Sequence, residues 1–147
     1  MDFYNFLKKN AKKDKIDKIV VGAIITNENG EIFLAERKKD DFMGGMFEIP
    51  GGNAEKGENI YDTLVREIKE ETNLNLKEVS KYINYFDYVS ESGKKCRQFN
   101  FRVEVEDGDI RLTEHDSYKW IRLDEIEEQK ISPEVKECLV IHRFNER

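Results

Sequence analysis

The chain has 147 residues, of which 38% are charged and 38% are apolar, and this suits one domain with an adequate core. Its formal net charge of -6 argues against a nucleic-acid polymer as the partner, because contact with a phosphate backbone requires a basic surface. A small nucleotide stays compatible with this charge if a bound metal ion supplies positive charge locally.

Nothing in the sequence indicates export or membrane insertion. Cys96 and Cys138 are too few and too far apart for a zinc-binding pattern, so we expect reduced, packed thiols. The N-terminus lacks the apolar segment of a signal peptide, and no stretch approaches the roughly 18 apolar residues of a membrane span. We therefore expect a cytoplasmic protein with no membrane partner, present as a monomer or a homodimer.

Residues 1–18 are a basic extension that differs in composition from the main domain, residues 19–147. The extension contains six lysines and three acidic residues, together with Phe3, Phe6 and Leu7. A short amphipathic helix is predicted here. One interpretation is a contact with a membrane surface or a partner; the favoured interpretation is an extension that packs its few aromatic side chains on the domain.

The main domain begins with two predicted strands. Residues 19–26 are almost entirely apolar and are typical of a buried strand. Asn29-Gly30 is a hairpin turn signal, and residues 31–37 return as the second strand.

An acidic helix is predicted after a glycine-rich turn. Glu67, Glu70 and Glu71 stand at positions i, i+3 and i+4, which places three carboxylates along one helix edge. Acidic clusters are common on solvated helix faces, but like charges at this spacing cost about 0.2–0.5 kcal/mol per pair, so a cation is their natural partner. Ligation by oxygen alone suits Mg²⁺ or Mn²⁺ better than zinc.

The same helix carries an apolar stripe beside its glutamate edge. We expect the helix to be half buried, with the carboxylates at the border of the core. The stripe consists of Tyr61, Leu64, Val65 and Ile68.

Two further strands are predicted at residues 79–90 and 95–106. In the second strand apolar and polar residues alternate, which predicts one core face and one polar face. The apolar set is Phe99, Phe101, Val103 and Val105, and the polar set is Gln98, Asn100, Arg102 and Glu104. Four aromatic residues of the first strand are candidates for stacking on a nucleobase, although core packing is favoured for most of them. They are Tyr82, Tyr85, Phe86 and Tyr88.

The last third of the chain contains one strand and two helices. Residues 118–123 are a predicted strand, and Asp124 is a predicted cap for a short acidic helix. Ser132 as N-cap and Pro133 at the first helical position predict the start of a final helix. His142 falls on the apolar face of that helix, and we expect a packed histidine there.

The segment that begins at Gly52 matches the Nudix box, G-x5-E-x7-R-E-U-x-E-E-x-G-U, where U is a bulky apolar residue. Asn73 stands where the pattern has glycine, and asparagine tolerates the left-handed conformation that ends a helix. With the preceding Pro50-Gly51-Gly52, the chain resembles the Nudix hydrolases, and among them the MutT-type nucleoside triphosphate pyrophosphohydrolases. The resemblance implies an α+β fold, an α/β/α sandwich with a mixed β-sheet and a catalytic loop-helix. The matching residues are Gly52, Glu58, Arg66, Glu67, Ile68, Glu70, Glu71 and Leu74.

The resemblance also implies roles in catalysis. Glu58 and Arg66 resemble the family's orienting pair, and Glu67 or Glu70 would accept a proton from the attacking water. Glu114, in the loop before the tryptophan-bearing strand, is either a metal ligand or an ordinary loop residue, and the neighbouring His115 is expected to be an exposed bystander. The implied ligands of a divalent cation, Mg²⁺ or Mn²⁺, are the Gly51 carbonyl, Glu67, Glu70, Glu71 and Glu114.

By the same resemblance, the substrate is a nucleoside diphosphate linked to another moiety, and a nucleoside triphosphate would yield the monophosphate and pyrophosphate. Arg37 would grip a phosphate, with a solvent-facing strand residue as the alternative. Pro133-Glu134-Val135 stands where enzymes that prefer oxidised guanine carry an asparagine, so that preference is not implied, although Glu134 could accept hydrogen bonds from a base.

Two alternatives to a triphosphate pyrophosphohydrolase stay open: a hydrolase of ADP-ribose or dinucleoside polyphosphates, and a non-catalytic nucleotide sensor. The implied substrate contacts are Arg37, Glu48, Ile49, Gly52 and Glu134.

Overall fold

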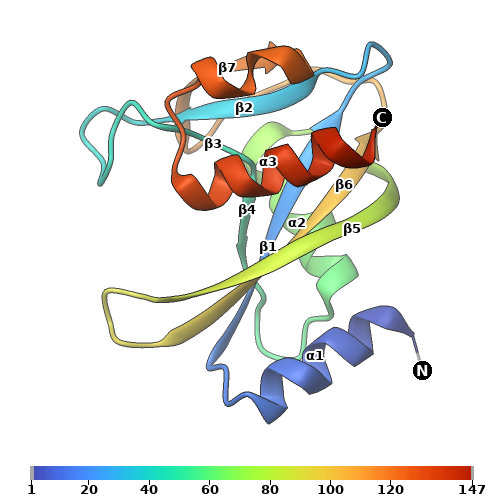
Figure 1. Cartoon of the computed structure of the whole chain (residues 1–147), viewed down its shortest axis with the longest axis vertical. Coiled ribbons are helices and arrows are strands. Elements are labelled where there is room, and N and C mark those ends of the chain that lie inside the picture. Colours follow the sequence, from blue (N-terminus) through green and yellow to red (C-terminus); the bar gives the residue numbers. More distant parts are fainter. Residues whose placement is uncertain (1, 147) are drawn as a thin grey trace.

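A computed structural model describes residues 2–146 (Figure 1). Within these residues no helix is long and apolar enough to cross a membrane. The helices are α1 (Phe3–Lys13), α2 (Ile60–Thr72), the 3₁₀ helix η1 (Leu123–Glu128) and α3 (Pro133–Asn145). The strands are β1 (Lys18–Thr26), β2 (Ile32–Arg37), β3 (Phe47–Glu48), β4 (Gly51–Asn53), β5 (Leu76–Val89), β6 (Lys95–Val105) and β7 (His115–Ile121).

The strands form one mixed, seven-stranded sheet in which β1 is central. Strand β1 pairs in parallel with β6 along its whole length, and β6 pairs antiparallel with β5 at the sheet edge. On its other side, β1 pairs first with β4, where Val21 lies opposite Gly52, and only at its end with β2. The glycine-rich turn is therefore bound to the central strand, and this fixes its position.

The predicted hairpin of β1 and β2 is present, but the two strands diverge directly after the turn. Asn27 accepts hydrogen bonds at its side-chain oxygen from the backbone N–H of Asn29 and of Glu31, both at 3.0 Å, and Gly30 has a φ of 75°. Thr26 and Ile32 are the one pair in register. Strand β2 then pairs with β7 and β3 instead, which opens room beside β1 for β4.

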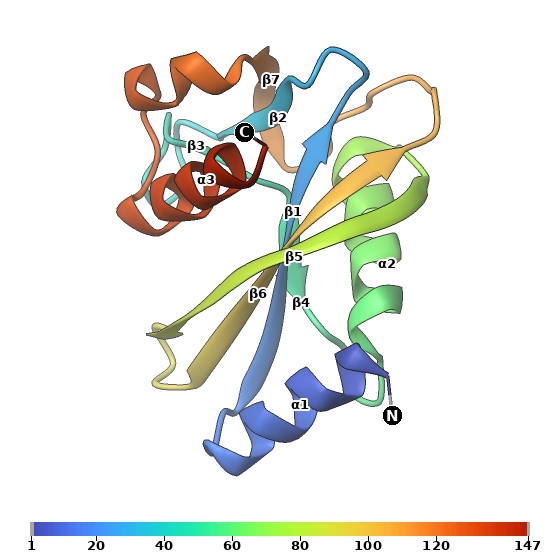
Figure 2. The ribbon, with the colours of Figure 1, turned by 45° about the vertical axis from the view of Figure 1, so that its right-hand side comes forward.

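Helices cover both faces of the sheet, and the expected α/β/α sandwich is confirmed (Figure 2). One core lies under α2 and α1 and is built from Val21, Ile25, Phe33, Leu64, Ile68, Phe99, Phe101 and their neighbours. The second core lies under α3 and η1 and is built from Ile24, Leu34, Ile49, Ile83, Ile126, Leu139 and their neighbours. His142 is buried in α3, as expected, and burial lowers its pKa.

Helix α1 packs on the domain through its apolar side. Asp2 caps its first turn by accepting a hydrogen bond from the N–H of Asn5 at 2.8 Å. Leu7 and Ala11 are buried in the first core, and Phe3 makes an edge contact with Tyr82, with the ring centroids 5.2 Å apart.

Two local expectations were wrong, and a third, the core-facing stripe of the half-buried helix α2, was confirmed only in part. Strand β7 begins at His115 and not at residue 118, because the polar residues at its start pair with the end of β2. The N-cap of η1 is Arg122 and not Asp124, because the Glu125 carboxylate accepts a hydrogen bond from the Arg122 N–H at 2.7 Å and starts the helix two residues earlier. In the stripe of α2, Tyr61 and Val65 are exposed by 39% and 37%, and only its other two members are fully buried.

The polar face of β6 is also more buried than its alternation predicted. Asn100 is fully buried and donates a hydrogen bond to the Asn84 side chain at 3.0 Å, while Gln98 donates to Asn100 at 2.8 Å. A Cβ at Gly22 on the neighbouring β1 would collide with both Gln98 and Asn100. The second helical layer therefore covers a face that the sequence pattern assigned to solvent.

Candidate active site

The catalytic loop-helix is fixed at both ends by local capping. At the start of α2, the Asn59 side chain accepts a hydrogen bond from the N–H of Asp62 at 2.7 Å. At its end, Asn73 adopts the left-handed conformation with a φ of 69°, and its N–H donates to the carbonyl of Lys69. The predicted substitution of asparagine for glycine as the helix stop is confirmed.

Arg66 is the hub of the site. Its guanidinium donates two hydrogen bonds of 2.9 Å to the two carboxylate oxygens of Glu58, one of 2.8 Å to Glu67 and one of 3.2 Å to Glu70. A further bond of 2.8 Å reaches the carbonyl of Asn53 in β4. Arg66 thus ties the helix to the glycine-rich turn and holds Glu67 in place.

Glu58 is the residue that holds the Arg66 guanidinium through two hydrogen bonds. The Arg66 guanidinium is the main cause that lowers the pKa of Glu58 to about 2, and hydrogen bonds from the Glu55 N–H and the Thr63 hydroxyl add to it. Glu58 is therefore ionised at neutral pH and keeps the charge-assisted pair with Arg66 intact.

Glu71 is the most deeply placed carboxylate of the edge. It is 4% exposed and accepts a hydrogen bond from the Gly51 N–H at 2.8 Å. Burial is the main cause that raises the pKa of Glu71 to about 9, and the nearby Glu67, Glu114 and Glu48 add to it. A carboxylate in this position requires a nearby positive charge to be stable in its ionised form.

The glycine-rich turn approaches these carboxylates as closely as its backbone permits. A Cβ at Gly51 would collide with the Val21 carbonyl, and a Cβ at Gly52 would collide with the Glu67 carboxylate. Glycine is therefore required at both positions by contact and not by backbone conformation.

The carboxylates fit a hard divalent cation by their chemistry. Burial also raises the pKa of Glu67, with Glu70 and Glu114 contributing, so negative charges from α2 and from the loop before β7 share one region. In residues 2–146, no three acidic, histidine or cysteine side chains converge closely enough to coordinate one ion. Arg66 and the Gly51 N–H donate hydrogen bonds to Glu67 and Glu71, respectively. A donor set of oxygens alone suits Mg²⁺ or Mn²⁺.

His115 is buried, which corrects the expectation of an exposed bystander. Its imidazole side chain is only 4% exposed, and its Nε2 lies 2.8 Å from Glu48. The other oxygen of Glu48 accepts a hydrogen bond of 3.0 Å from Arg37, which also donates one of 2.8 Å to the carbonyl of Phe42. Arg37 is therefore partly engaged by the protein itself.

A cavity of about 340 Å³ opens beside this network. Phe86 and Tyr88 of β5 line it, whereas Tyr82 packs toward the first core and Tyr85 lies under the Arg97 guanidinium at 4.4 Å. Ile49 is buried in the second core and is not among the lining residues. The lining residues are Arg37, Met43, Met46, Phe47, Glu48, Phe86, Tyr88, Gln98, Ser132, Glu134 and Val135.

The structure thus brings the sequence-predicted residues together in two adjoining groups. Glu58, Arg66, Glu67, Glu70 and Glu71 meet the glycine-rich turn. Arg37, Glu48 and Glu134 line the cavity. The methionines of the 38–46 loop and Gln98 were not predicted, because nothing in their spacing indicates that they face a site.

Known proteins match this chain in sequence and in structure. A family model of the NUDIX domain matches residues 17–140. The 8-oxo-dGTP diphosphatase of Buchnera aphidicola subsp. Schizaphis graminum is 30% identical over 112 residues, which cover 76% of this chain and 82% of that protein. An ADP-ribose pyrophosphatase of Methanocaldococcus jannaschii is 41% identical over 70 residues, 46% of this chain and 40% of that protein.

Solved structures show the same fold. The MutT protein from Methanosarcina mazei Go1 aligns with a TM-score of 0.76 and 25% identity, over 88% of this chain and 96% of that chain. An Ap4A hydrolase from C. elegans aligns with a TM-score of 0.68 and 22% identity, over 88% of this chain and 96% of that chain, which supports the fold alone.

Proposed function

The chain belongs to the Nudix hydrolase family as a MutT-type pyrophosphohydrolase, and on this premise we propose that its substrate is a nucleoside triphosphate, cut to the monophosphate and pyrophosphate. One observation carries the proposal: the short segment Glu48–Gly51 links the two halves of the site. Glu48 lines the cavity, and three residues later the Gly51 N–H contacts Glu71. A base in the cavity would therefore have its phosphates directed at the carboxylate edge.

Nudix enzymes generally require a divalent cation, and we propose Mg²⁺ or Mn²⁺ here. When bound, such an ion neutralises phosphate oxygens and lowers the pKa of the attacking water. Glu67 and Glu70 are the two candidates for accepting the proton of that water, and their hydrogen bonds from Arg66 hold both carboxylates in position. The residues proposed to hold the ion are the Gly51 carbonyl, Glu67, Glu70, Glu71 and Glu114.

The cavity suits the nucleoside. Its volume of about 340 Å³ is at the lower end of the range for small-molecule sites, and rings from β5 offer faces for stacking. Glu134, in the first turn of α3, would accept hydrogen bonds from the amino and imino groups of a base. The volume of the cavity suits a single nucleoside.

The test is a substrate panel with Mg²⁺ or Mn²⁺ on nucleoside triphosphates, oxidised guanine nucleotides, ADP-ribose and dinucleoside polyphosphates. Pyrophosphate release is measured for the triphosphates, and chromatography identifies the mononucleotide and sugar-phosphate products of every substrate. We expect pyrophosphate from triphosphates, with strong loss of turnover in Glu67→Gln or Glu70→Gln. Glu91→Gln, an exposed carboxylate in the β5–β6 turn, is the matched control.

Two outcomes would redirect the proposal. Turnover of ADP-ribose or dinucleotides alone would move the chain to the alternative substrates. Absence of any metal-dependent turnover would instead favour a nucleotide-sensing role, although the complete set of acidic box residues argues against it.

A further inference from the structure

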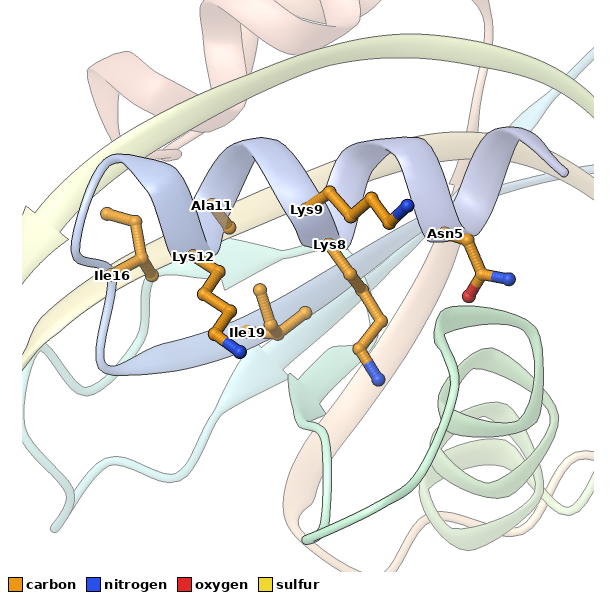
Figure 3. Close-up of a pocket in the computed structure, with 7 residues that line it drawn as sticks. All are labelled: Asn5, Lys8, Lys9, Ala11, Lys12, Ile16 and Ile19. Atoms are coloured by element: carbon orange, nitrogen blue, oxygen red, sulfur yellow. The ribbon is translucent and has the colours of Figure 1, made fainter. Parts of the chain in front are cut away.

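Helix α1 overhangs a hollow that lies outside the site described above. The hollow has a volume of about 520 Å³ and lies between α1 and the start of β1. Lys8 and Lys12 project from α1 to the same side, with Ile19 between them, and Asn5 lies at the end nearest the loop that precedes α2 (Figure 3). The lining thus combines ammonium groups with an apolar floor.

The charge of this region is opposite to that of the rest of the chain. Of the 25 basic and 31 acidic residues, six and three, respectively, lie in residues 1–18. The extension is therefore net positive on a protein that is otherwise strongly acidic. Such segregation of charge favours an anionic ligand at α1 and disfavours one elsewhere on the surface.

The lysines that line the hollow have no carboxylate partners in the described part of the chain. Every ion pair among residues 2–146 uses an arginine or a histidine, and none includes Lys8, Lys9 or Lys12. Lys8 donates one hydrogen bond of 3.2 Å to the backbone carbonyl of Glu58, which leaves two of its three N–H groups available. The ammonium groups of Lys8 and Lys12, on the same side of α1, can therefore serve a ligand, and Lys9 adds a third positive charge beside the hollow.

The shape of the region favours a small ligand over a membrane surface. The apolar side of α1 is already used, because Leu7 and Ala11 are buried in the first core. The floor of the hollow is made by Ile16 and Ile19, which are partly buried. A concave, apolar floor under positive charges suits a molecule with both a phosphate and an apolar part.

We propose that this hollow is a second anion site, which binds a phosphate-bearing small molecule of the nucleotide or polyphosphate class. The bound group has two conceivable sources: a separate nucleotide, or the far end of a long substrate whose near end occupies the active site. The second source rests on the proposed function, because Lys8 contacts the carbonyl of Glu58 in the catalytic loop. The first does not depend on it.

Direct binding tests the site without catalysis. Inorganic pyrophosphate and ADP are titrated into the full chain in EDTA, where the uncompensated carboxylates of the active site repel anions, and binding is followed by calorimetry and by amide resonances. We expect saturable binding that weakens with salt, with shifts confined to α1 and the start of β1. Lys9→Gln/Lys12→Gln should weaken it on the order of fivefold or more.

The matched control is Lys13→Gln/Lys15→Gln, which removes the same charge from residues that do not line the hollow. A higher KM for dinucleoside polyphosphates but not for triphosphates in the first double variant would assign the site to a long substrate. Weaker ADP binding with both KM values unchanged would assign it to a separate nucleotide. Equal weakening in both double variants, no saturable binding, or binding only to anionic lipid vesicles would overturn the proposal.

Discussion

The carboxylate edge of α2 and the cavity beside it are built in different ways. The edge comes from one stretch of chain between the glycine-rich turn and the end of α2, and its geometry is set by helical spacing and by Arg66. The cavity draws its walls from β2, β3, β5, β6, the 38–46 loop and α3. The carboxylate edge, where we propose that the chemistry takes place, is thus local in sequence, whereas the cavity proposed to bind the nucleoside depends on long-range packing.

The largest effect is expected from removing a charge at the carboxylate edge. Glu71→Gln keeps an acceptor for the Gly51 N–H but removes a carboxylate from the proposed cation site, so kcat/KM should fall at least about a hundredfold. Because burial raises the pKa of Glu71 to about 9, the neutral side chain should not lower the melting temperature in EDTA. Turnover within about threefold of Glu91→Gln would contradict the role of Glu71 as a ligand.

The second largest effect is expected from Glu58, whose carboxylate pairs with Arg66 of α2. Glu58→Gln loses two charge-assisted bonds to Arg66, and we expect about 1–3 kcal/mol less stability at neutral pH together with about tenfold lower kcat. Glu58 has a pKa lowered from 4.5 to about 2 in the folded chain, so its contribution is present above about pH 4.5 and is lost as the pH falls toward 2.

Denaturant unfolding at neutral pH and at about pH 3 measures this dependence. The difference in unfolding free energy between the unaltered chain and Glu58→Gln should shrink at the lower pH. A difference that is constant over this range would mean that the ionised pair is not the source of the stability.

Substitutions in the cavity are expected to lower activity less than those at the carboxylate edge, and to change KM instead of kcat. Tyr88→Ala removes a ring from its wall and should raise KM about threefold to tenfold with little change in kcat. Tyr85→Ala, on the same strand but outside the lining, is the control. A fall in kcat with an unchanged KM would remove the distinction between the two regions.

The smallest effect is expected at the end of α2. Asn73→Gly restores the residue of the Nudix pattern at a left-handed position and should stabilise the chain by less than about 1 kcal/mol, because the lost bond from the Asn73 side chain to the Asp109 carbonyl partly offsets the gain. Asn73→Val should instead destabilise it, because a β-branched residue is strained at this φ. The melting temperatures of both variants are compared with that of the unaltered chain. A higher value for Asn73→Gly and a lower value for Asn73→Val would show that backbone strain at this position sets the stability.

Much of the fold and of the carboxylate edge was predictable because it rests on short-range rules. The glutamate spacing, the left-handed stop at Asn73 and the start of α3 at Ser132 each depend on residues within a few positions of one another. The layered fold followed from the resemblance of that segment to a known family.

The sequence by itself determined which residues share the edge of α2 and where that helix stops, and it predicted that a cation accompanies its carboxylates. Tertiary structure alone decided the burial of His115 against Glu48 and of Asn100 against Asn84 on the neighbouring strand. The physical reason is that these environments are set by partners far away in the chain. Strand register and helix packing bring those partners together, and a local sequence pattern does not predict which distant residues will meet.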